Sequence, residues 1–100
     1  MLDKLKQWLG LSPKVDVTAL MAEGAVVVDV RTPAEYRQGH VPGSINVPLH
    51  SLPEGLKKIK RNEVVITCCA SGMRSASAAS LLRKQGFQKV YNGGSWRKLW

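Results

Sequence analysis

The chain has 100 residues, of which 44% are hydrophobic, and this supports one domain with a single packed core. The net charge of +8 is unevenly spread. Residues 1–63 hold nine Lys or Arg and seven Asp or Glu, whereas residues 64–100 hold six Lys or Arg and no acidic residue. The composition excludes disordered, collagen-like and coiled-coil chains, and no apolar run approaches the roughly 20 residues of a membrane span.

The basic second half leaves three interpretations open. It is a solvated surface, or it attracts a small anionic substrate, or it meets an acidic protein partner. Nucleic acid is not favoured, because no helix-turn-helix, zinc-finger or RNP signature is present and aromatic residues make up only 6% of the chain. The N-terminus has no continuous apolar segment or small-residue cleavage site of a secretory signal, so we expect a cytoplasmic protein.

Residues 1–12, MLDKLKQWLGLS, have apolar side chains at helical spacing. They predict an amphipathic helical extension that precedes a domain over residues 13–100. The favoured interpretation is a helix folded onto that domain. Contact of residues 1–10 with a membrane surface or a partner is the alternative.

Two continuous apolar and β-branched runs, 25-AVVVDV-30 and 64-VVITCC-69, predict strands that are buried on both faces. Residues 45–47 and 88–91 predict shorter strands, and 92-NGGS-95 predicts a tight turn or loop. Strands buried on both faces are typical of a parallel sheet covered by helices.

Four helical segments lie around these strands. Residues 18–24 have Thr18 as the expected cap, and residues 33–39 begin at Pro33 after the capping Thr32. Residues 51–60 predict a short helix. Residues 75–86 end at Gly86, with Phe87 placed to close a Schellman-type end. Strands alternating with helices predict the α/β class.

Polar residues follow each predicted strand: Asp29 and Arg31, Asn46, Cys69, and then residues 92–94. Because ligands bind beyond the carboxyl ends of parallel strands, we expect these groups to converge on one edge of the sheet.

The adjacent cysteines Cys68 and Cys69 do not suit a disulfide, because a bridge between neighbours strains the chain and closes almost no loop. With no C-x-x-C motif, and with His40 and His50 lacking paired ligands, we expect neither a metal nor a cofactor. Side chains alternate along a strand, so Cys68 is assigned to the core and Cys69 to the edge of the sheet.

The loop after Cys69 suits a reactive thiol. Gly72 can take a positive φ, and Arg74 stands at the start of the following helix. Loop N–H groups, the helix start and the arginine would together lower the thiol pKa and favour the nucleophilic thiolate. A buried, inert cysteine is the alternative.

Three segments in order, 29-DVRTPAEYRQGHVPGSINVP-48, 69-CASGMRSASAA-79 and 90-VYNGG-94, resemble the single-domain rhodaneses, which are thiosulfate sulfurtransferases. The resemblance covers about residues 15–94. It implies a rhodanese-like α/β domain with a central parallel sheet of about five strands and helices on both faces. It also implies that Cys69 takes sulfane sulfur from a donor such as thiosulfate, becomes a persulfide and passes the sulfur to cyanide or a thiol.

The family loop C-x-x-G-x-R-S matches residues 69–75 without a gap. The loop is one residue shorter than the C-x5-R loop of the related phosphatases, which suits a terminal sulfur better than a phosphate. The resemblance implies a substrate-binding loop made of Ala70, Ser71, Gly72, Met73, Arg74 and Ser75. Two roles stay open for its arginine, which either binds the anionic donor or braces the loop against a carboxylate.

Around that loop, Arg31 is expected at the mouth of the pocket. Asp29 is expected to have a structural role, paired with an arginine or with N–H groups. The resemblance places His40 in a G-H-V-P-G turn, which it would hold by hydrogen bonds. Trp96 or Trp100 either covers the pocket or packs on the core.

Two alternatives to an enzyme remain. The first is a non-catalytic binding or regulatory module on the same fold. The second is a persulfide sulfur carrier that serves a protein or a tRNA-thiolating partner.

Overall fold

A computed structural model describes residues 16–100 and shows one parallel sheet with the strand order β2-β1-β3-β4. The strands are β1 (Val26–Asp29), β2 (Ile45–Asn46), β3 (Val65–Cys69) and β4 (Val90–Ser95). The α/β class is confirmed, with four strands in the described residues where about five were expected. The predicted extension over residues 1–12 lies outside the described residues. Among residues 16–100, no helix combines the length and apolar character that a membrane span requires.

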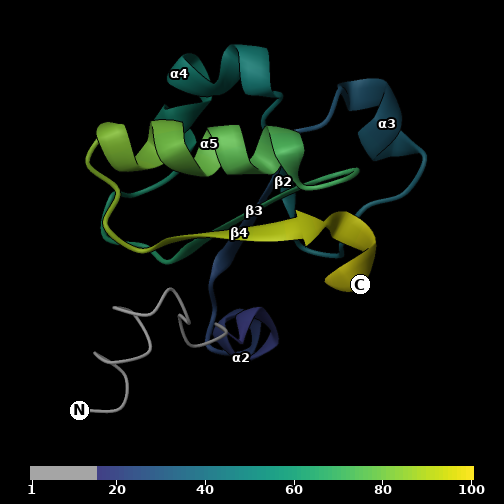
Figure 1. Ribbon diagram of the computed structural model, residues 1–100, viewed down its shortest axis with the longest axis horizontal. Coiled ribbons are helices and arrows are strands. Elements are labelled where there is room, and N and C mark those ends of the chain that lie inside the picture. The colour runs from purple at the N-terminus through teal and green to yellow at the C-terminus, as the bar shows by residue number, and fades with distance from the viewer. Residues whose placement is uncertain (1–15) are drawn as a thin grey trace, which may run out of the picture.

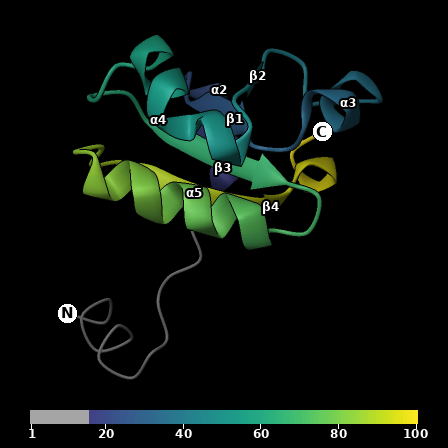
Figure 2. The ribbon, with the colours of Figure 1, turned by 90° about the horizontal axis from the view of Figure 1, so that it is seen from above.

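Helices cover both faces of the sheet (Figures 1 and 2). They are α2 (Val17–Ala22), α3 (Pro33–Arg37), α4 (Leu52–Gly55) and α5 (Met73–Lys84), with short 3₁₀ turns η1 (Leu49–Ser51), η2 (Leu56–Lys58) and η3 (Trp96–Lys98). Figure 1 shows α4 and α5 on one side of the strands and α2 on the other. The same view places α3 and the C-terminus near the end of the sheet where α5 begins.

Alternation along the strands divides the core into two clusters. The cluster under α4 and α5 includes Val28, Leu82 and Cys69. The cluster on the opposite face includes Ile66 and Cys68, with α2 packed against it. The period of two along a strand therefore places the neighbouring cysteines on opposite faces, as predicted.

Several predicted helix ends are confirmed. The Thr32 side chain accepts from the N–H of Glu35, and the Glu35 carboxylate accepts from the N–H of Thr32, which forms a capping box ahead of Pro33. Gly86 has a φ of 100°. The N–H of Phe87 donates to the carbonyl of Leu82 at 3.1 Å, which closes a Schellman end.

Three other helix boundaries were wrong. The cap of α2 is Asp16, which accepts from the N–H of Ala19, and Thr18 lies inside the helix. The 51–60 segment splits into 3₁₀ and α-helical turns. Helix α5 begins at Met73, because Gly72, with a φ of 101°, turns the chain directly into it.

The prediction of a loop at residues 92–95 was wrong, because β4 runs through Ser95. Its register with β3 shifts between the pairs Thr67–Asn92 and Cys69–Ser95, which marks a bulge. A Cβ on Gly93 would lie 2.7 Å from Ile66 Cγ2 and 3.0 Å from the carbonyl oxygen of Thr67. Only glycine lets β4 approach β3 closely enough to stay paired there.

The strand ends meet as expected. Asp29 pairs in register with Asn46 on one side and with Cys68 on the other, and Cys69 pairs with Ser95. The Asn46 amide donates to the carbonyls of Asp29 and Arg31 at 3.0 and 2.9 Å, which ties two strand ends together.

Candidate active site

Cys69 ends β3 directly beneath the start of α5. Its Sγ accepts a hydrogen bond from the N–H of Gly72 at 2.9 Å and another from the N–H of Ser75 at 3.4 Å. Gly72 is the N-cap of α5 and has no side chain that could accept these protons. The sulfur therefore takes the place of a capping oxygen, in the positive field at the helix start.

These hydrogen bonds lower the pKa of Cys69 below its ordinary value. Burial of the thiol acts in the opposite direction and is the largest single influence, but the hydrogen bonds together outweigh it. The donors, in order, are the side chain and N–H of Ser75 and the N–H groups of Gly72 and Ser71. Donors to the charged form favour the thiolate, which is the nucleophile.

Cys68 differs from Cys69 in its surroundings and not in its exposure to solvent. Both cysteines are buried, at 0% and 1% exposed, so the expected contrast between a core Cys68 and an edge Cys69 does not appear in accessibility. Burial, followed by the charge of Asp29, raises the pKa of Cys68 to about 12. At neutral pH Cys68 is therefore a protonated, unreactive thiol.

Ser75 connects the sulfur to β4. Its Oγ lies 3.5 Å from Cys69 Sγ and 2.6 Å from Asn92 Oδ1. The single hydroxyl proton can serve Asn92 while the thiol is protonated and can turn to the sulfur when the thiolate forms. The Asn92 amide also donates to the carbonyl of Gly72 at 3.2 Å. The sequence placed residues 92–94 at this edge of the sheet but gave Asn92 no individual role.

Arg74 braces the loop. Its Nη1 and Nη2 donate to the two carboxylate oxygens of Glu35 at 2.8 and 3.0 Å. This side-chain hydrogen bonding, ahead of the bonds from Thr32, lowers the pKa of Glu35 to about 2. The carboxylate is thus charged at any physiological pH. Of the two roles left open for Arg74, the structure shows the contact with a carboxylate.

Arg31 and Asp29 form a buried ion pair with exposed fractions of 4% and 0%. Arg31 donates to both carboxylate oxygens at 2.7–3.0 Å, and its Nη2 also donates to the carbonyl of Gly39 at 2.7 Å. The hydrogen bonds that Arg31 donates to the Asp29 carboxylate raise the pKa of Arg31. Asp29 therefore has the expected arginine partner, and the Arg31 charge is already balanced by it.

The remaining predicted residues lie around this centre. His40 Nδ1 donates to the carbonyl of Tyr36 at 2.8 Å, and the two rings stack with centroids 3.8 Å apart. Met73 projects from the start of α5 and is 79% exposed. Trp100 is 71% exposed and contacts Trp96 edge-on.

A cavity of about 340 Å³ adjoins the Cys69 loop and is lined by Arg31, Glu35, Gln38, Ala70, Trp96 and Arg97. Trp96 forms part of the wall of this cavity and also packs against the core cluster that contains Ile66 and Cys68, so it meets both alternatives. Sequence reasoning missed Gln38 and Arg97, since nothing in the local pattern places them beside residue 70.

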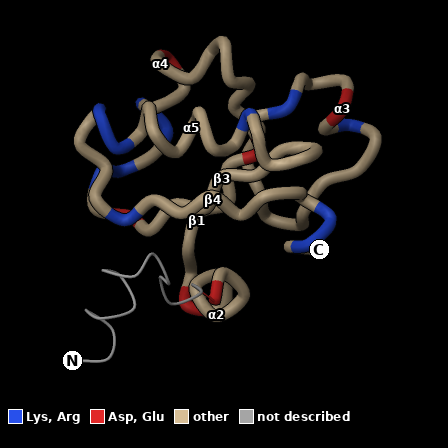
Figure 3. The backbone as a smooth tube through the Cα atoms, in the orientation of Figure 1, with Lys and Arg blue, Asp and Glu red and all other residues tan. Residues whose placement is uncertain are grey.

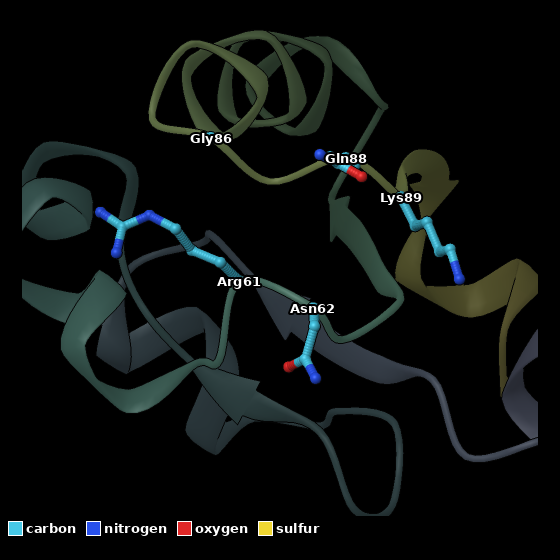
Figure 4. A pocket seen from close by; sticks show the side chains of 5 residues that line it. All are labelled: Arg61, Asn62, Gly86, Gln88 and Lys89. Atoms are coloured by element: carbon cyan, nitrogen blue, oxygen red, sulfur yellow. The ribbon is translucent and has the colours of Figure 1, made fainter.

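A second cavity, of about 280 Å³, lies elsewhere and is lined by Arg61, Asn62, Gly86, Gln88 and Lys89 (Figure 4). These residues precede β3 and β4, so the cavity lies at the amino ends of the strands. Cys69 is at the opposite, carboxyl end, and the second cavity is therefore separate from the thiol.

Alkylation of Cys69 by iodoacetamide is expected to reach half its maximal rate below pH ~8.5, the midpoint of an ordinary cysteine. The rate should rise with pH and level off above the pKa, because only the thiolate reacts. Ser75→Ala should move the midpoint upward, since it removes a donor to the sulfur. Rates measured by peptide mass spectrometry from about pH 5 to 10 would check this. A midpoint at or above that of free cysteine would contradict it.

Comparisons with known proteins agree with this geometry. A model of the rhodanese-like domain family matches residues 14–98. The thiosulfate sulfurtransferase GlpE of Pseudomonas entomophila is 35% identical over 96% of this chain and 87% of its own length. Among solved structures, a rhodanese with anions from E. coli matches with a TM-score of 0.69 and 33% identity, covering 74% of this chain and 89% of its own.

The human single-domain sulfurtransferase TSTD1 matches with a TM-score of 0.75 and 28% identity, covering 82% of this chain and 87% of its own. The resemblance noted in the sequence is confirmed, and this chain belongs to the rhodanese-like domain family.

Proposed function

We propose that this protein is a thiosulfate sulfurtransferase in which Cys69 carries the transferred sulfur as a persulfide. The observation that carries the proposal is the position of the Cys69 sulfur, which accepts hydrogen bonds from two N–H groups at the start of α5. The same groups that stabilise a thiolate can stabilise the terminal charge of a persulfide. The names of the relatives support the reaction class.

The first half-reaction is a displacement at sulfur. The Cys69 thiolate attacks the outer sulfur of thiosulfate, and a bond forms between Sγ and that sulfur. The bond between the two donor sulfurs breaks, and its electron pair leaves with sulfite. The hydrogen bonds that lower the pKa of Cys69 favour the thiolate, and the proposed step assigns no separate general base.

In the second half-reaction an acceptor, cyanide or a thiol, attacks the outer sulfur and returns the Cys69 thiolate. A reducing compartment such as the cytosol would keep both thiols free, as the chemistry requires. If the acceptor is a thiol on an acidic protein, the basic residues at the C-terminus, which lies at the same end of the sheet as the start of α5, would attract it (Figure 3).

Mass spectrometry of the protein after thiosulfate treatment tests this function. We expect a gain of one sulfur atom on the peptide that contains Cys69, reversed by a reducing agent. The gain should persist in Cys68→Ser and vanish in Cys69→Ser. A gain that follows Cys68 would overturn the assignment. No gain in the wild-type protein would favour the non-catalytic binding module.

A further inference from the structure

The cavity beside Ala70 has a surplus of positive charge. Among the lining residues and their ion-pair partners, two arginines are paired, Arg31 with Asp29 and Arg74 with Glu35. Arg97 lines the same cavity, and no carboxylate in residues 16–100 forms an ion pair with it. The charges of the lining residues and of their ion-pair partners therefore sum to +1, and Arg97 supplies the unbalanced charge.

The exposed guanidinium of Arg97 lies over the indole of Trp96. Arg97 Cζ lies 5.5 Å from the ring centroid, and Arg31 Cζ lies 4.5 Å from it. A Cβ on Gly39 would come within 3.1 Å of Trp96 Cη2, so the glycine leaves room for the ring. A guanidinium stacked on an aromatic face keeps its N–H groups available along its edge, where they can bind an oxyanion through two hydrogen bonds.

Position and size match a small sulfur donor. Ala70 directly follows Cys69, so the cavity adjoins the loop that carries the thiol, and its volume of about 340 Å³ lies at the small end of ligand sites. The loop residues 70–73 contribute no cation of their own. An anionic donor that reaches Cys69 from this side therefore meets Arg97 as its unpaired positive partner.

We propose that Arg97 binds the oxyanion end of the sulfur donor in this cavity, in the orientation that points the outer sulfur at Cys69. The proposal rests on the sulfurtransferase function, and what it adds is the residue that binds the donor oxyanion. Arg74, for which the sequence left donor binding and bracing open, and Arg31, expected at the mouth of the pocket, are both engaged with carboxylates.

Sulfate protection of Cys69 from iodoacetamide tests the subsite without requiring turnover. Sulfate has the oxyanion but no transferable sulfur, and ionic strength is held constant with chloride. We expect sulfate to slow alkylation in the wild-type protein. The half-protecting concentration should rise about tenfold in Arg97→Gln, and by less in Arg97→Lys, which keeps the charge but loses the planar fork.

Lys98→Gln is the matched control, because Lys98 is exposed on the same 3₁₀ turn and does not line the cavity. It removes the same charge from the protein and should leave protection near the wild-type value. Equal effects in Lys98→Gln and Arg97→Gln, or no protection in the wild-type protein, would overturn the subsite.

The thiosulfate concentration that half-saturates persulfide formation on Cys69 is measured in the same variants. It should rise about tenfold in Arg97→Gln while the amount formed at saturation stays unchanged. A persulfide that forms with unchanged half-saturation would refute the subsite and leave the sulfurtransferase function standing. Sulfate protection without any persulfide would refute the sulfurtransferase function and leave the anion subsite standing.

Discussion

Cys69→Ser is expected to reduce thiosulfate:cyanide turnover to the background rate, a loss of at least about 10³-fold. A serine hydroxyl cannot supply the thiolate, because the donors around Sγ cannot lower an alcohol pKa into the neutral range. Cys68→Ser is expected to keep most of the turnover, because Cys68 lies on the opposite face of the sheet and its thiol pKa is about 12. Steady-state release of thiocyanate measures both variants.

Folding has to be checked alongside turnover, because both cysteines are buried. A hydroxyl in the apolar cluster around Cys68 is expected to cost about 1–3 kcal/mol of unfolding free energy. Cys68→Ala, which adds no polar group, serves as the second control and should also keep its turnover. Loss of turnover in a folded Cys68→Ala protein, with Cys69→Ser still active, would reverse the assignment of the two thiols.

Asp29→Ala is expected to destabilise the domain by about 3–5 kcal/mol, the usual cost of removing one partner of a buried ion pair. Arg31 is 4% exposed and would be left charged with no carboxylate partner. The stability of a domain is of the order of 5–15 kcal/mol, so this loss would consume much of it. Urea unfolding, followed by tryptophan fluorescence, measures the change in the transition midpoint.

The other ion pair provides a matched control. Glu35 and Arg74 have side chains 35% and 37% exposed, so water already screens their interaction. Glu35→Gln is expected to cost less than about 1 kcal/mol, and the amide keeps an oxygen for the capping box. Equal losses in Asp29→Ala and Glu35→Gln would show that burial does not set the energy of these pairs.

Much of the fold follows from patterns that are local in sequence. Continuous β-branched runs gave the two central strands. Helix ends were predicted where the terminal residues themselves decide them: the Thr32 side chain caps α3 before Pro33, and Gly86 takes the positive φ that ends α5 before Phe87. The prediction failed at residues 92–95, because pairing with β3 extends a segment whose two glycines read as a loop. Cross-strand hydrogen bonds there override the local preference.

The separation of Cys68 from Cys69 is a property of the chain itself. Alternation within a strand and the spacing to Gly72 and Arg74 are set by residues a few positions apart, so they can be read before folding. The roles of the arginines could not be read in this way. Arg74 meets a carboxylate 39 residues away, and Arg97 meets the wall beside Ala70 only when η3 reaches the end of the sheet. Because the charge of a long side chain does not identify its partner, packing alone decides which arginines pair with a carboxylate and which one does not.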